Sequence, residues 1–313
     1  MHSGNAQILS MKRLPFVLLA IFSSAGCCLA GEEPAAAIEP PAKKVKISYE
    51  IEGDYSYVGP ARTETGHHDS GNLTEQNALL RLVMAPQWGE GPIFRFGIEL
   101  ERYSFGLPGN APLPNTLEST SLIVGMDFQL FDSWLVRVEA EPGFYSDFRD
   151  IDHGDFNVPF IVGGSYIAGA SLQWIVGVSV DVNRRYPVIP AVGVRWNFMD
   201  KWTLNLVLPS PRLEYEASKG VTLYAGGDLK SGTYRVSEDF GDAHGHQRLN
   251  NAIVDYDEVR VGGGVSWKTT PGLTFELEAG YMPYREFNFH RAEEGYTSKE
   301  GAAYGQVGFS AKF

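Results

Sequence analysis

The chain has 313 residues, of which 43% are hydrophobic and 12% aromatic, and its formal net charge is −12. This length allows one large β domain or two ordinary domains, and the acidic balance excludes the basic surface that nucleic-acid binding needs. Glycine (35), tyrosine (15) and phenylalanine (18) are abundant. Long helix-forming runs of Ala, Leu, Glu and Lys are missing. The composition therefore favours an all-β chain with no nucleic-acid partner.

The first 30 residues have the layout of a secretory signal peptide. Lys12 and Arg13 precede an apolar stretch over residues 14–22, and small residues follow up to Ala30. The apolar stretch is shorter than the roughly 20 residues that a membrane-spanning helix needs. We therefore expect export and cleavage after Ala30. Lipidation of Cys27, within SAGCC, is the alternative.

Residues 31–44, rich in Pro, Ala and Glu, are predicted to be a flexible lead-in. From Val45 to Phe313 the sequence then alternates between apolar and polar residues, beginning with VKISYEIEGDYSY. Strict alternation predicts strands with one apolar and one polar face. It recurs in residues 80–84, 94–101, 122–130, 134–141, 174–182, 192–198, 258–267, 274–279 and 303–313.

Long and short connections between these runs alternate along the chain. We expect tight turns near residues 88–91, 131–133, 168–170, 199–201, 218–220 and 270–272, and long loops at 59–74, 105–117, 148–157, 237–252 and 289–301. Long loops at one end and short turns at the other are the organisation of an outer-membrane β-barrel. We therefore predict that residues 45–313 form a single transmembrane antiparallel up-and-down barrel with both termini periplasmic.

The number of strands depends on the segment LVLPSPRLEY, in which Pro209 and Pro211 interrupt the alternation. If this segment is a hairpin with a proline tip, the barrel has about 14 strands; if the hairpin is too short to span, about 12 full strands remain. A soluble sandwich is the competing fold. Mixed charges on the polar faces, as at Arg137 and Glu139, and aromatics beside the turns, as at Trp134, favour the barrel.

Three stretches resemble a family of uncharacterised bacterial proteins described as outer-membrane β-barrels and defined by a domain of unknown function. They are IPAVGVRWNFMDKWTLNLVLPSPRLEYEASKGVTLYAGG (189–227), EPGFYSD (141–147) and YMPYREF (281–287). The resemblance implies the barrel fold and a location in the outer membrane of Gram-negative bacteria. It implies no activity, because the family has no catalytic motif to transfer.

Charged residues on the polar faces are the candidates for lining a lumen. Acids predominate among them, which predicts a weak preference for cations. The first hypothesis is a passive, porin-like pore of unknown specificity; the alternatives are a structural or surface-binding barrel whose lumen is closed by its own ion pairs, and an outer-membrane enzyme. The lumen candidates are Arg95, Glu99, Glu101, Asp127, Arg137, Glu139, Glu141, Arg195, Glu258, Arg260, Glu276 and Glu278.

The sequence contains no recognisable catalytic constellation and no cofactor motif. Its seven histidines fall mainly in predicted loops, and a model with no Ser or Asp near His290 would remove the best enzyme candidate. Acidic and histidine clusters leave a metal site open without matching a known spacing. The metal candidates are Asp150, Asp152, His153, Asp155, His244 and His246.

The C-terminal run AAYGQVGFSAKF is expected to be the closing strand, paired with residues 45–57 so that no open edge meets lipid. Phe309 and Phe313 are expected to be the signal that the barrel-assembly machinery recognises. The other expected partners are outer-membrane lipid and lipopolysaccharide.

Overall fold

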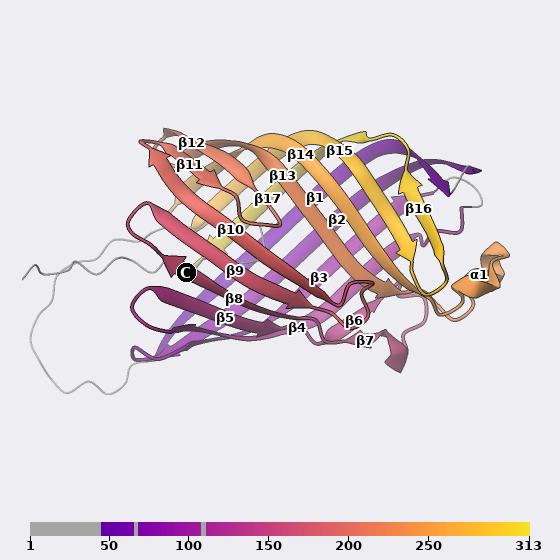
Figure 1. The fold of residues 1–313 in the computed structure, drawn as a ribbon, viewed down its shortest axis with the longest axis horizontal. Helices are drawn as coiled ribbons and strands as arrows, with labels where there is room; N and C mark the ends of the chain where they lie inside the picture. Colours follow the sequence, from indigo (N-terminus) through magenta and orange to yellow (C-terminus); the bar gives the residue numbers. More distant parts are fainter. Residues whose placement is uncertain (1–44, 66–67, 108–110) are drawn as a thin grey trace, which may run out of the picture.

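The computed structural model describes residues 45–65, 68–107 and 111–313. The predicted signal peptide, Cys27 and the lead-in 31–44 lie outside the described residues. The described chain forms a closed antiparallel barrel of 14 strands with up-and-down connectivity (Figure 1). The all-β prediction and the higher of the two strand numbers are thus confirmed. No helix in the described ranges is long and apolar enough to cross a membrane.

The ring follows chain order. Its strands are β1 (Val45–Thr65), β2 (His68–Trp88), β3 (Ile93–Gly106), β4 (Thr116–Gln129), β5 (Trp134–Ala140), β8 (Phe160–Ile167), β9 (Leu172–Val180), β10 (Val188–Met199), β11 (Trp202–Asn205), β12 (Arg212–Ser218), β13 (Val221–Arg235), β14 (Ile253–Thr270), β15 (Leu273–Phe289) and β17 (Ala302–Lys312).

Shorter elements lie at the long-loop end. The strands β6 (Gly143–Ser146), β7 (Phe156–Asn157) and β16 (Glu294–Ser298) extend the pairing of their neighbours. The short helices η1 (His153–Asp155), α1 (Phe240–His244) and η2 (Gln247–Leu249) lie in the connections. Figure 1 shows α1 at the end of the barrel opposite the hairpin of β11 and β12.

The apolar face of the sheet is on the outside and the charged face is on the inside. In β14, for example, Val261 and Trp267 are exposed while Arg260 is fully buried. The same reversal holds in β4, where Leu122 and Val124 are exposed and Asp127 is buried. A soluble sandwich hides its apolar faces between its sheets. The barrel therefore has an outer surface suited to an apolar solvent.

β17 closes the ring by pairing with β1 from Tyr304 to Lys312. At the seam, the Tyr49 N–H donates to the Phe313 carbonyl (2.7 Å) and the Phe313 N–H donates to the Tyr49 carbonyl (3.0 Å). The Phe309 ring covers Gly53, where an added Cβ would meet the ring at 2.6 Å. The final residue is therefore part of the ladder, which confirms the expected closing strand.

Two changes at the C-terminus separate this seam from an assembly signal. Deletion of Phe313 removes both backbone hydrogen bonds to Tyr49, whereas Phe313→Ala keeps them and removes only the ring. If the ring is an assembly signal, we expect Phe313→Ala to be enough to lower the amount of folded barrel in isolated membranes. The folded fraction is measured as the heat-modifiable band on gels of unheated samples. Normal assembly of the alanine variant together with failure of the deletion would restrict the role of Phe313 to the seam.

The prediction of a long loop at 59–74 is wrong. β1 continues to Thr65 and β2 begins at His68, so that this segment is a projecting hairpin. Register shifts between Val58 and Ala61 absorb Gly59 and Pro60, which interrupt the alternation in the sequence. A β-bulge accommodates such residues without ending the strand.

Candidate functional site in the barrel lumen

A cluster of buried aromatic and aliphatic side chains, here called the aromatic plug, occupies the lumen near the long loops. Its members come from the long-loop ends of β2, β3, β4, β13, β14 and β15, from β16 and from the connections. They are Leu73, Tyr103, Phe105, Ala111, Leu113, Leu117, Tyr234, Val236, Phe240, Leu249, Ala252, Val254, Tyr256, Phe287, Phe289 and Tyr296.

Aromatic contacts in the plug join strands that are not neighbours in the ring. Phe287 of β15 lies 4.9 Å from Phe105 of β3 in an edge-to-face contact and 4.9 Å from Tyr256 of β14, measured between ring centroids. Tyr103 lies 4.9 Å from Tyr256. Such pairs add to the free energy gained by burying the rings. The plug therefore fills this half of the lumen with a packed hydrophobic core.

Backbone contacts also bridge the mouth. Arg235 at the end of β13 pairs in parallel with Ser146 of β6, although these strands lie on different sides of the ring. The Asp147 N–H donates to the Arg235 carbonyl (3.0 Å), and the Ser237 N–H donates to Asp147 Oδ2 (3.0 Å). The walls are thus tied together at the long-loop end by hydrogen bonds as well as by the plug.

A buried ion network lies directly beneath the plug. Glu75 of β2 accepts from Arg260 of β14 (3.0 Å) and Arg285 of β15 (3.1 Å), and Arg260 also contacts Glu258 (2.8 Å). The Tyr256 hydroxyl donates to Glu75 (2.5 Å), which connects the network to the plug. All four charged side chains are at most 1% exposed. Buried charges of this kind require partners that satisfy them.

A second ion network covers the wall formed by β2 to β5. Arg81 contacts Glu99 at 2.8 Å and also contacts Glu139. Arg95 of β3 contacts the same Glu139 at 2.8 Å. Arg137 of β5 contacts Asp127 of β4 at 2.7 Å. The network therefore connects the polar faces of four consecutive strands along the lumen wall.

A third group of ion pairs lies on β10, β12 and β15, and its side chains differ in exposure. Arg195 of β10 contacts Glu214 of β12 at 3.0 Å, and these side chains are 29% and 20% exposed. Arg212 contacts both Glu276 (3.3 Å) and Glu278 (3.5 Å). The lumen is therefore packed in its long-loop half, whereas its short-turn half contains both buried ion pairs, such as Arg137–Asp127, and the partly exposed pair Arg195–Glu214.

Eleven of the twelve lumen candidates take part in these ion pairs or in the Arg81–Glu141 pair (3.4 Å). The twelfth, Glu101, accepts hydrogen bonds from Asn77 (3.1 Å) and Tyr234 (3.5 Å). Glu75 and Arg285, which are central to the buried network, are not among the lumen residues predicted from the sequence. Glu75 has the same inward parity as Asn77 and Arg81 along β2. This parity could have identified it, but the loop predicted at residues 59–74 placed the start of the strand too late.

The metal candidates do not gather into a ligand set. The described ranges contain no group of three or more His, Cys, Asp or Glu side chains placed to hold an ion. The Asp152 N–H donates to Asp155 (3.1 Å) in the cap of η1, and burial raises the pKa of the Asp155 carboxyl. His244 contacts the Phe240 carbonyl (2.8 Å), and His246 lies 3.1 Å from Glu294.

His290, the best candidate for a catalytic base, has a carboxylate partner but, among the described residues, no nucleophile within reach. His290 Nδ1 lies 3.3 Å from Asp255 Oδ2. Asp255 also accepts from the Thr233 hydroxyl (2.9 Å) and from the Arg185 N–H (2.8 Å). The carboxylate lies between the histidine and the hydroxyl, so Thr233 is not placed to be activated by the imidazole. The contacts describe a structural link between strands and loops.

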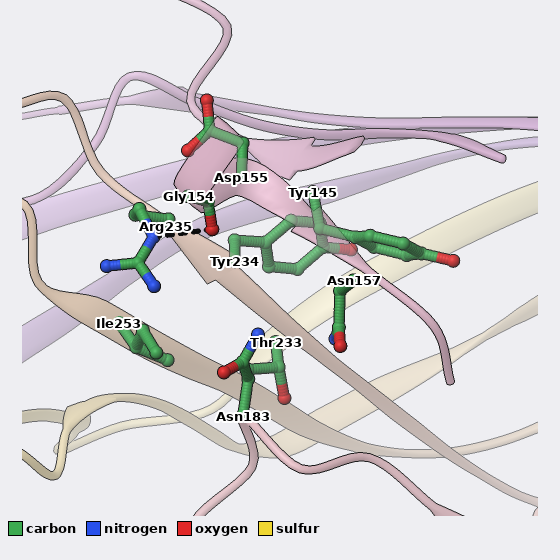
Figure 2. A pocket seen from close by; sticks show the side chains of 9 residues that line it. All are labelled: Tyr145, Gly154, Asp155, Asn157, Asn183, Thr233, Tyr234, Arg235 and Ile253. Atoms are coloured by element: carbon green, nitrogen blue, oxygen red, sulfur yellow. Dashed lines mark hydrogen bonds between the residues drawn. The ribbon is translucent and has the colours of Figure 1, made fainter. Parts of the chain in front are cut away.

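A small polar cavity of about 10 Å³ lies next to this link. Figure 2 shows the side chains of Asn183, Thr233 and Arg235 around it, with Arg235 Nε donating to the Gly154 carbonyl (2.9 Å). This volume suits about one water molecule. The cavity is therefore too small for a substrate.

The fold is similar to those of solved outer-membrane proteins at very low sequence identity. An outer-membrane channel from Pseudomonas putida F1 is 10% identical, with a TM-score of 0.47 over 88% of this chain and 100% of that chain. A mutant of the TodX monoaromatic hydrocarbon channel is 8% identical, with a TM-score of 0.45 over 85% and 90%. A FadL homologue from Pseudomonas aeruginosa is 8% identical, with a TM-score of 0.35 over 86% and 90%.

The search of curated proteins gave no match. The profile of a domain of unknown function, DUF6268, matches residues 110–310, which is more than half of the chain. The matched region contains most of the ring together with both partners of the contact that bridges the mouth. The chain therefore belongs to the DUF6268 family.

Proposed function

We propose that this chain is a bacterial outer-membrane barrel that transports small solutes, with its short turns and both termini facing the periplasm. The observation that carries the proposal is the charged short-turn half of the lumen, where Arg195 and Glu214 are partly open to solvent. The inverted sheet, with its apolar face outside, supports the membrane location. A strand of about 9–11 residues is sufficient to cross the membrane, and most of the ring strands reach that length.

The charges in the short-turn half favour cations. Glu214, Glu276 and Glu278 share two guanidinium groups, those of Arg195 and Arg212. An excess of carboxylates along a pore raises the local concentration of cations and excludes anions. The transport path is therefore cation-selective, and the aromatic plug keeps its outer end closed in the resting state.

Planar bilayers test this proposal. The folded barrel is expected to give small, brief current steps whose reversal potential in a KCl gradient indicates preference for K⁺. The double variant Glu214→Gln with Glu276→Gln is expected to move the reversal potential towards zero, the value of a pore that does not select between K⁺ and Cl⁻. Glu238→Gln is the matched control, because Glu238 is exposed in the connection after β13. A heat-modifiable barrel that never gives a current step would exclude the pore.

The filled upper lumen favours one alternative. A barrel held shut by the plug and by the buried network around Glu75 also fits a structural or surface-binding role. The two functions separate when the plug is shortened, because only a transport barrel has a water-filled path beneath it. The expected currents of such a variant are given in the Discussion.

A further inference from the structure

The wall of the barrel is interrupted where the hairpin of β11 and β12 ends. The Leu206 N–H donates to the Val194 carbonyl (2.8 Å), which is the last bond between β10 and this hairpin. On the other side, the Leu229 N–H of β13 donates to the Pro209 carbonyl (3.0 Å). Beyond these bonds, towards the long loops, no ladder joins β10 to β13 in the part of the chain that the structure describes.

The two facing edges carry unpaired backbone groups. Because Val194 bonds towards β11, the residues of the same parity, Val188, Pro190 and Val192, direct their backbone groups away from β9 and towards β13. Ser231 and Thr233 of β13 direct theirs towards β10 by the same rule. None of these groups has a backbone partner among the described residues. Pro190, which has no N–H, is a residue typical of a strand edge.

The interruption is closed at its upper side. The connection between β9 and β10 reaches β14, where the Arg185 N–H donates to Asp255 Oδ2 (2.8 Å). Asn183 of the same connection lines the small cavity together with Thr233 (Figure 2). The gap is therefore a framed opening, here called the β10–β13 window. It is bounded by residues 181–187, 188–192, 206–211 and 229–233.

Side-chain exposure agrees with an opening through the wall. Both parities of β10 are exposed at the window, with Val192 63% exposed on the outer parity and Ile189 38% exposed on the inner parity. In the intact wall next to it, Ile175 of β9 has the inner parity and is 1% exposed. The outer rim is aliphatic, with exposed Val188, Leu206, Leu208 and Leu229.

The window lies within the membrane-crossing length of β10. A tilted strand crosses in about 9–11 residues, and the window residues fall within that distance of Met199 at the short-turn end of β10. Unpaired backbone groups at membrane depth are tolerated only where they are buried in protein or line a water-filled cavity. On its β13 side the window is level with the buried network, since Lys230 pairs with Glu258 and Gly232 with Tyr256 of β14. The plug residue Tyr234 follows this edge directly and closes the lumen above it. The window is therefore a wall opening at the lower edge of the plug, with the partly exposed pair Arg195–Glu214 on its short-turn side.

We infer that the β10–β13 window is a lateral portal for small apolar or amphipathic molecules that are neutral or positively charged. This inference rests on the proposed transport function and names its substrate class. The aliphatic rim suits an apolar body, whereas the carboxylate-rich lumen at Glu214 and Glu276 disfavours an anionic group. Such a molecule passes between the periplasmic side of the lumen and the outer leaflet without crossing the plug.

The first test asks whether bilayer lipid reaches an inward-facing residue at the window. Cys27 and Cys28 are replaced by Ser, and single cysteines at Ile189, Val192 and Ser179 are labelled with bimane. Ser179 is the control, because it is paired with Ile189 across the intact β9–β10 ladder. In vesicles of chain-brominated phosphatidylcholine, the labels at Ile189 and Val192 are expected to be quenched equally, and the label at Ser179 to keep its fluorescence. An Ile189 label that behaves like Ser179 would overturn the portal.

The second test closes the window chemically. The pair Pro190→Cys and Ser231→Cys is bridged with a bis-maleimide, and the control pair Pro190→Cys and Val178→Cys is bridged within the intact ladder. In cells, entry of N-phenyl-1-naphthylamine above the vector background is expected to be lost in the window pair and kept in the control pair. Unchanged entry in both pairs would contradict the inference.

Conductance separates this inference from the proposed function. The bridged window pair is expected to keep its brief cation-selective current steps, because in the proposed function ions cross when the plug opens and not through the window. Loss of probe entry with intact currents supports the portal. Intact currents with unchanged probe entry reject the portal and retain the pore, and absence of currents in every variant rejects the pore itself.

Discussion

Replacement of Arg260 by Met is expected to destabilise the folded barrel by about 3–5 kcal/mol, the cost typical of removing one partner from a buried ion pair. Arg260 is fully buried and lies between two carboxylates, Glu75 (3.0 Å) and Glu258 (2.8 Å). Its removal leaves two acids close together, with Arg285 bound to Glu75 and Lys230 opposite Glu258 as the remaining cations. Arg260→Lys is expected to restore part of the loss, because one ammonium group cannot reproduce the planar set of donors.

A matched arginine on the surface is the control for this experiment. Arg102 contacts Glu118 at 3.4 Å, and the Arg102 side chain is 58% exposed. Exposed pairs contribute roughly 0–1 kcal/mol, so Arg102→Met is expected to change stability little. The free energy of unfolding is measured by urea titration in lipid vesicles, followed by tryptophan fluorescence. Equal losses for Arg260→Met and Arg102→Met would show that the buried network does not hold the barrel together.

The course of the strands could be predicted because alternation is a local property. Residues 45–57 and 303–313 show the period of two directly, and their pairing at the seam follows from the need to close a barrel. The proline hairpin also follows from local chemistry, since Pro209 and Pro211 lack the N–H that a ladder needs. The ring has the 14 strands of the higher prediction. The prediction of 12 full strands also has a basis, because β11 in the proline hairpin has only 4 residues.

The prediction of the connections was weaker, because turn-forming residues do not always end a strand. Gly59 and Pro60 were interpreted as the start of a loop, whereas the bulge between Val58 and Ala61 keeps β1 in register with β2. The charged faces of the strands could be predicted without knowing where the bulges lie. Their partners could not be predicted, because Glu75 and Arg285 are separated by 210 residues in sequence. Contacts across a lumen depend on ring order and register together.

The aromatic plug was invisible for the same reason. Tyr103 and Phe105 share the inward parity of Glu99 and Glu101 along β3, so the alternation itself places them in the lumen. Nothing local shows that Phe287 meets them across the lumen, because that contact joins β3 to β15, which is not its neighbour in the ring. Apolar residues at inward positions near a strand end are therefore a signal worth reading in such chains. They indicate where a lumen is filled rather than open.

Removing two rings from the plug is expected to produce the largest functional change. In the variant with Phe105→Ala and Phe287→Ala, the edge-to-face pair at the centre of the plug is lost, and each truncation of a buried phenylalanine costs about 3–5 kcal/mol locally. The ladders of the ring do not depend on these rings, so the barrel is expected to remain folded while its upper lumen loosens. Water entering that half joins the short-turn half below.

The measurable consequences are larger and longer current steps in planar bilayers and increased sensitivity of cells to a bulky antibiotic that the intact outer membrane excludes. Phe144→Ala with Phe156→Ala is the matched control, because these rings also form an edge-to-face pair (5.9 Å) but lie exposed on β6 and β7. If the plug variant stays heat-modifiable and carries no more current than the control, the ion networks beneath the plug are sufficient to close the lumen. A structural role would then be better supported than transport. Any pore must gain a wide water-filled path when its seal is removed.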